Sequence, residues 1–153
     1  MAAFQPQDPA FEARVRESFA RQKAMGLIGA VLARVAPGHV EIELPFRDDL
    51  TQQHGFFHAG IVATIADSAG GYAAFTLMPA GSSVLSVEYK INLVAPADGE
   101  RLVAGGQVVG PGRTLTVCDL EVHVLGGGAR TLCARGMQTL ICVQRPPAGA
   151  RPG

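Results

Sequence analysis

Asp67 is the residue whose type and setting most clearly indicate chemistry. It is the only charged residue between positions 59 and 77, a stretch of otherwise small and apolar residues that predicts a buried helix. A carboxylate there costs free energy unless it is paired or used. Its neighbours one helical turn away are all small, which leaves space for either a ligand or a closely packed partner helix: Ala63, Thr64, Gly70 and Gly71.

The predicted start of this helix offers a second chemical group. If the helix begins near Ala59, the backbone N–H groups of Ala59, Gly60 and Ile61 have no helical acceptor. Such amides, aided by the helix dipole, can stabilise an oxyanion or a polarised thioester carbonyl. His58 immediately precedes them, although a single histidine in this position is more often structural.

The spacing of His58 and Asp67 limits how the two groups can cooperate. Nine residues of helix rise about 13.5 Å and turn about two and a half times, so the helix start and Asp67 face opposite sides. One carbonyl cannot reach both within a single chain. If both groups act in one reaction, they come from different subunits, which predicts a homodimer with composite sites.

The remaining sequence predicts an antiparallel sheet that supports the helix. Helical spacing indicates an N-terminal helix at residues 9–25, and apolar alternation bounded by Gly- and Pro-rich turns indicates strands. We expect an α+β fold in one domain, residues 1–143, followed by a flexible tail at residues 144–153. The expected strands are residues 27–35, 40–44, 84–94, 101–109, 114–125 and 130–143.

Composition excludes several classes of function. Thirteen basic and thirteen acidic residues cancel, so neither nucleic acid nor an anionic membrane is an expected partner. Cys118, Cys133 and Cys142 are odd in number and scattered, which predicts no metal site and a reducing, cytoplasmic location. The N-terminus lacks the pattern of a signal peptide.

Three segments together resemble a known family. Residues 58–69 read HAGIVATIADSA, residues 86–97 read SVEYKINLVAPA, and residues 112–114 read GRT. Over residues 27–143 the chain resembles the hotdog-fold thioesterases of the PaaI-like, phenylacetic-acid-degradation type. The resemblance implies a sheet wrapped around a long central helix, and hydrolysis of an acyl- or aryl-acyl-CoA to free acid and CoA without a cofactor.

The resemblance also implies roles for individual residues. Asp67 would be the general base or nucleophile, and the amide of Ala59 or Gly60 would polarise the carbonyl. His58 would order that loop, and Ser86 would position the attacking water or the aspartate.

The resemblance implies three further residues, one of which departs from the family pattern. Gln52, with Gln53 beside it, stands where related proteins of the human type have an asparagine. Arg113 and Lys90 would lie towards the CoA moiety. The assembly would be a dimer or, as we expect, a dimer of dimers.

Two other functions are compatible with the same fold. One is hydration or dehydration of acyl-thioesters, which usually needs a histidine–acid pair at the helix. The other is non-catalytic binding of acyl-CoA linked to gene control, for which the short, mixed-charge N-terminal helix is a poor DNA-binding module. Four aromatic residues could line an acyl pocket or simply pack in the core: Phe56, Phe57, Tyr72 and Phe75.

Overall fold

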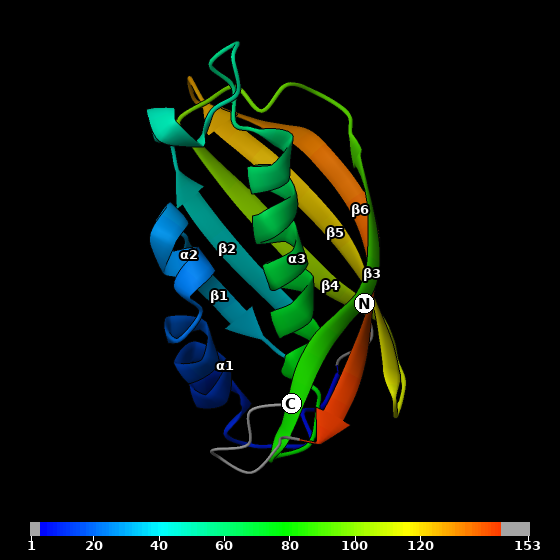
Figure 1. Cartoon of the computed structure of the whole chain (residues 1–153). Coiled ribbons are helices and arrows are strands. Elements are labelled where there is room, and N and C mark those ends of the chain that lie inside the picture. Colours follow the sequence, from blue (N-terminus) through cyan, green and yellow to red (C-terminus); the bar gives the residue numbers. More distant parts are fainter. Residues whose placement is uncertain (1–3, 145–153) are drawn as a thin grey trace, which may run out of the picture.

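One antiparallel sheet carries a long helix across one of its faces (Figure 1). The computed structural model describes residues 4–144. The six strands lie in the order β1-β2-β4-β5-β6-β3. This confirms the predicted α+β architecture. The strands are β1 (Val31–Ala36), β2 (His39–Pro45), β3 (Ser82–Leu93), β4 (Arg101–Pro111), β5 (Leu115–Gly126) and β6 (Ala129–Gln144).

The central helix, α3 (Ala59–Phe75), forms where the sequence predicts it and ends two residues earlier than expected. Its buried side includes Ile65 and Ala69, which pack with inward-facing strand residues such as Leu120. Gly106 on β4 permits this close approach, because a Cβ there would collide with the main chain of Ala69. The helix is therefore held tightly against the sheet.

The N-terminal segment folds as two helices, α1 (Phe11–Ala20) and α2 (Lys23–Ile28), so the single helix predicted for residues 9–25 is wrong. Gln22 leaves the helical conformation, with φ −76° and ψ 95°. Its side chain accepts a hydrogen bond from Ser68 on α3 at 3.2 Å. The break thus lets the segment contact the central helix.

The first strand starts later than predicted, because residues 27 and 28 belong to α2. Gly29 adopts a left-handed conformation with φ 79° and ends that helix. The strand β1 begins only at Val31 and forms a hairpin with β2 through Gly38, which also has positive φ.

Strand β3 lies at the edge of the sheet and pairs only with β6 among the described strands. It exposes apolar side chains, with Leu85 58% and Val87 55% accessible. Gln144 pairs with Ser82, so β6 extends one residue into the segment expected to be a tail. The remainder of that segment, residues 145–153, lies outside the described residues. No helix in residues 4–144 is long and apolar enough to span a membrane.

Candidate active site

Asp67 and Ser86 lie together, as the resemblance implied. Asp67 is half-buried in the middle of α3, and the Ser86 hydroxyl on β3 donates a hydrogen bond to its Oδ1 at 2.6 Å. The register of β3 against β6 shifts between Ser86 and Glu88, an irregularity typical of a β-bulge. Ser86 stands opposite the buried Leu140 and therefore faces the helix side of the sheet.

Gln138 on β6 is a third member of this group, which sequence reasoning missed. Its Nε2 lies 2.6 Å from Asp67 Oδ1 and 3.0 Å from Ser86 Oγ, and donates to both. The alternation of β6 could have indicated this residue, because the apolar residues 134 and 140 face inward and position 138 is in phase with them. A glutamine in phase with them is a buried polar residue, which needs partners.

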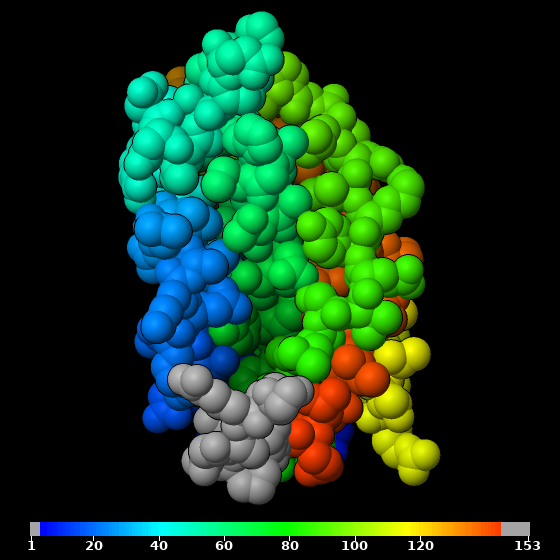
Figure 2. Space-filling model, in the orientation of Figure 1, coloured from blue at the N-terminus to red at the C-terminus, as the bar shows by residue number. Residues whose placement is uncertain are grey.

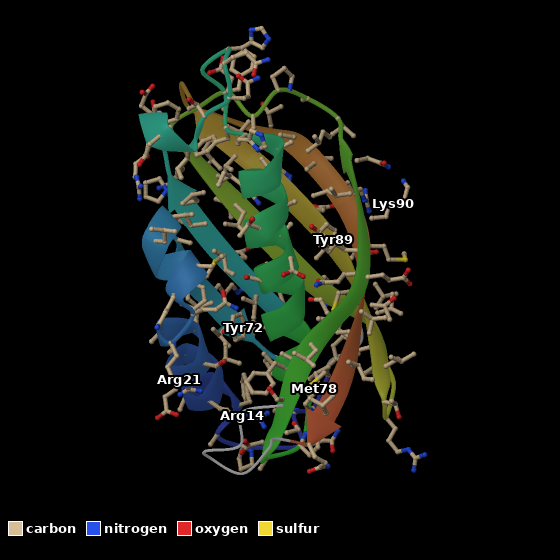
Figure 3. The ribbon with its side chains drawn as sticks, in the orientation of Figure 1. Arg14, Arg21, Tyr72, Met78, Tyr89 and Lys90 are labelled. Atoms are coloured by element: carbon tan, nitrogen blue, oxygen red, sulfur yellow. The ribbon has the colours of Figure 1, made fainter. Side chains whose placement is uncertain are left out.

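A pocket of about 260 Å³ opens beside Asp67. Tyr72 and Phe75 of α3 form part of its wall, and the α1–α2 segment forms another part. Burial raises the pKa of the Tyr72 phenol, whose hydroxyl lies 3.1 Å from the Ser18 hydroxyl on α1. Figure 2 shows this face hollowed between the blue N-terminal helices and the green β3, and Figure 3 shows Tyr72 between α3 and those helices. The other lining residues are Arg21, Gln22, Asp67, Ser68, Gly71, Ser83, Val84, Ser86 and Leu140.

The two adjacent glycines of α3 have different explanations. A Cβ on Gly70 would collide with Gln138 Oε1 and come within 2.6 Å of Leu120, so this glycine is required for packing. A Cβ on Gly71 would meet Leu140 at an ordinary 3.6 Å, and Gly71 lines the pocket. Close packing therefore explains Gly70, whereas Gly71 keeps the pocket open.

The start of α3 is more ordered than expected. His58 is the N-cap, and its Nδ1 accepts a hydrogen bond from the Gly60 amide at 2.9 Å. The Ile61 amide donates to the His58 carbonyl, also at 2.9 Å. Of the three amides expected to lack a helical acceptor, those of Gly60 and Ile61 therefore have acceptors, whereas the Ala59 N–H has none among the described residues. His58 orders this turn directly, by accepting the hydrogen bond that caps it.

Gln52 and Ala59 both line a second pocket of about 440 Å³, together with Phe56 and Phe57. Its Oε1 accepts a hydrogen bond from the His54 amide, which leaves the side-chain NH₂ as a donor. Gln53 is exposed and contacts His54 instead. Of the two glutamines, Gln52 is the one that lines the same pocket as Ala59, and its role remains a prediction.

The two pockets are separate within one chain. Asp67 and Ser86 line the first, Gln52 and Ala59 line the second, and the described linings have no residue in common. Because α3 is continuous from Ala59 to beyond Asp67, the eight-residue separation of these two positions gives a helical rise of about 12 Å.

The two cations expected near CoA lie outside both of these pockets. Lys90 is exposed on β3, where its Nζ donates to Asn92 Oδ1 at 2.8 Å, and Figure 3 shows it on the side of the strand away from α3. Arg113 is exposed in the turn between β4 and β5. A role for either in binding CoA remains a prediction.

The buried cysteines do not supply a nucleophile. Burial raises the pKa of Cys118 to about 12 and that of Cys133 to about 11, so both are neutral thiols near pH 7. Within residues 4–144, no cluster of His, Cys, Asp or Glu could hold a metal ion. Asp67 is therefore the ionisable group in the first pocket best suited to act as a base.

Known proteins share this sequence and fold. A family described as the thioesterase superfamily matches residues 54–130. A thioesterase family protein from Silicibacter pomeroyi is 46% identical, with 88% of this chain and 99% of that one covered and a TM-score of 0.87. Acyl-coenzyme A thioesterase 13 of Homo sapiens is 29% identical over 119 residues, which is 77% of this chain and 81% of that protein. The E. coli PaaI protein, at 16% identity, shares the fold with a TM-score of 0.78 over 90% of this chain and 96% of its own.

The chain therefore belongs to the thioesterase superfamily. It is a PaaI-like protein with the hotdog fold and a thioester hydrolase, as the resemblance implied.

Proposed function

We propose that this protein is an acyl-CoA thioesterase in which Asp67 is the general base or nucleophile. The observation that carries the proposal is the hydrogen bond between Ser86 and Asp67 at the mouth of a pocket. Ser86 and Gln138 both donate to Oδ1, and Oδ2 has no partner among the described residues. Oδ2 is thus the oxygen available to a water molecule or to the thioester carbon.

The reaction also needs a donor for the thioester oxygen, and we assign this role to the Ala59 N–H with Gln52 beside it. In one chain these groups lie in the other pocket. We propose that two subunits pair antiparallel through β3, because this long apolar edge strand is a template for pairing. Two antiparallel α3 helices then bring the start of one helix close to Asp67 of the other.

The acyl group would occupy the pocket beside Asp67. We propose an aryl or medium-chain acyl group as its occupant; its volume within one chain is about 260 Å³, and the partner subunit would add to its walls. Tyr72 and Phe75 provide aromatic walls for such a group.

Hydrolysis suits this site better than hydration of a double bond. Hydration usually requires a histidine–acid pair, and the Nδ1 of His58 is already used to accept the hydrogen bond from Gly60 that caps α3. Helix α1 packs against β1, α2 and α3, so the N-terminal segment is part of the fold and not a separate DNA-binding module.

The test is release of free CoA thiol by the full chain from a panel of phenylacetyl-, hexanoyl- and palmitoyl-CoA. We expect turnover of the aryl and medium-chain substrates, and a loss of at least about 100-fold in kcat for Asp67→Asn. Asp119→Asn, which removes a carboxylate on the opposite face of the sheet, is the matched control and should keep activity. Binding of a non-hydrolysable CoA thioether without thiol release from any substrate would instead indicate an acyl-CoA sensor.

A further inference from the structure

Gln138 is the most completely buried polar side chain next to the Asp67 site. It lies on β6, is 1% exposed, and belongs to a strand whose inward-facing neighbours are apolar. Burying an amide in such a position costs free energy unless its polar atoms are used. The arrangement of those atoms indicates what the side chain does.

The amide nitrogen of Gln138, which carries two hydrogens, lies within hydrogen-bond distance of three acceptors of the site. These are Asp67 Oδ1 at 2.6 Å, the Asp67 main-chain carbonyl at 3.2 Å, and Ser86 Oγ at 3.0 Å. Because an amide nitrogen can only donate, Ser86 Oγ must accept from Gln138 and direct its own hydrogen to Asp67. Gln138 therefore fixes the direction of the Ser86 hydroxyl as well as the position of the carboxylate.

The orientation of the Gln138 amide follows from its surroundings. The opposite orientation would place Oε1 against the Asp67 carboxylate, where two acceptors repel. In the observed orientation Oε1 lies against Gly70 without a hydrogen-bond partner, in space that exists only because Gly70 lacks a Cβ. The orientation that directs the NH₂ group at Asp67 therefore leaves Gln138 Oε1 without a hydrogen bond and requires glycine at position 70.

We propose that Gln138 is a positioning residue of the hydrolytic site, which holds Asp67 Oδ1 and the Ser86 hydroxyl so that Asp67 Oδ2 faces the substrate. This inference rests on the proposed function of Asp67. Gln138 adds a residue of strand β6 to a site that the sequence analysis built from the central helix and Ser86.

The test compares Gln138→Leu and Gln138→Glu with the wild-type full chain, using an acyl-CoA that the wild type hydrolyses. Leucine removes the donors and keeps an approximate fit, and we expect kcat to fall by about 10- to 100-fold with little change in KM, since the acyl pocket is unaltered. Gln107→Leu is the matched control, because Gln107 is a half-buried glutamine on β4 that donates to main-chain carbonyls away from Asp67. Its kcat should match the wild type.

The split between kcat and KM separates positioning from simple packing. A merely structural role would lower the amount of folded enzyme and leave the kcat of the folded fraction near the wild-type value. Loss of the positioning donors lowers kcat in the folded enzyme itself. In Gln138→Glu a carboxyl group replaces the donor NH₂, so kcat should fall at least as far as in Gln138→Leu.

Distinct outcomes identify which proposal fails. If the wild type turns over and Asp67→Asn does not, an unchanged kcat in a folded Gln138→Leu overturns the role of Gln138 alone. If both Gln138 variants fail to fold, as judged by circular dichroism, the residue is structural and the inference is also overturned. If the wild type hydrolyses no thioester, the proposed function fails and the role of Gln138 fails with it.

Discussion

Arg14 on α1 donates a hydrogen bond of 2.6 Å to the main-chain carbonyl of Pro79, four residues beyond the end of α3. The same guanidinium donates to the carbonyls of Phe75 and Met78, at 3.1 and 2.7 Å, and pairs with Asp8 at 3.3 Å. Phe75 is the last residue of α3, and Met78 and Pro79 belong to the turn that follows it. One side chain thus caps the central helix and fastens the segment that forms a wall of the Asp67 pocket.

Arg14→Met is expected to lower the free energy of unfolding by at least about 2 kcal/mol, because several carbonyls lose a charged donor. Arg16→Met is the control on the same helix. Arg16 forms an exposed pair with Glu12, with side chains 48% and 53% accessible, and its loss should cost below about 0.5 kcal/mol. Urea unfolding followed by circular dichroism measures both values, and equal losses would contradict the capping role.

The adjacent glycines of α3 predict opposite effects of the same substitution. Gly70→Ala should destabilise the protein by about 1–3 kcal/mol, because its Cβ overlaps Gln138 and Leu120. Gly71→Ala should be neutral or stabilising by up to about 1 kcal/mol, because alanine favours the helix. It should nevertheless raise KM for the bulkier acyl groups by narrowing the pocket. Thermal melts together with thiol-release kinetics on both variants would reveal any departure from this pattern.

The Ala59 amide can be removed without disturbing the helix. Ala59 is the first residue of α3, where proline is well tolerated, and His58 before it has the extended conformation that a following proline requires (φ −62°, ψ 139°). Ala59→Pro should therefore keep the native melting temperature and lose about 100-fold or more in kcat. Ala59→Gly retains the N–H and should stay active. Full activity of a folded Ala59→Pro enzyme would rule this amide out as the donor.

Mixing two inactive variants tests whether the site is shared between subunits. In a heterodimer of Asp67→Asn and Ala59→Pro, one composite site carries both changes and the other carries neither. Random pairing makes about half of the dimers mixed, so about a quarter of the wild-type activity should return. Refolding the two variants together and assaying thiol release measures this. A mixture as inactive as its components would place Asp67 and its donor amide within one subunit, or in an arrangement without exchange.

Local pattern was enough to predict the central helix, its start near Ala59, and the strands β2 to β6. Each depends on periodicity or turn residues within a short stretch. The contact between Ser86 and Asp67 was anticipated only through the family resemblance, since the two residues come from different elements. The break at Gln22 was missed because the apolar spacing continues across it, and it depends on a contact with Ser68 that only the tertiary fold creates.

Gln138 could not be placed from sequence because it is 71 residues from Asp67 and its contact depends on the register of β6 against β3. A shift of one residue would turn its side chain to the other face of the sheet. The number of free amides at the helix start was also overestimated. Sequence indicates where a helix begins, but not that the His58 ring accepts a hydrogen bond from Gly60.

Strand β3 combines two properties: its free edge is open to another chain, and its inward face carries Ser86. If copies of the protein join along that edge, the neighbour's backbone would also hold in place the strand whose Ser86 donates a hydrogen bond to Asp67. Turnover per subunit would then depend on the protein concentration, because dilution would dissociate the subunits and lower their activity. The rate of hydrolysis would therefore depend on the concentration of folded protein through assembly, as well as on the concentration of substrate.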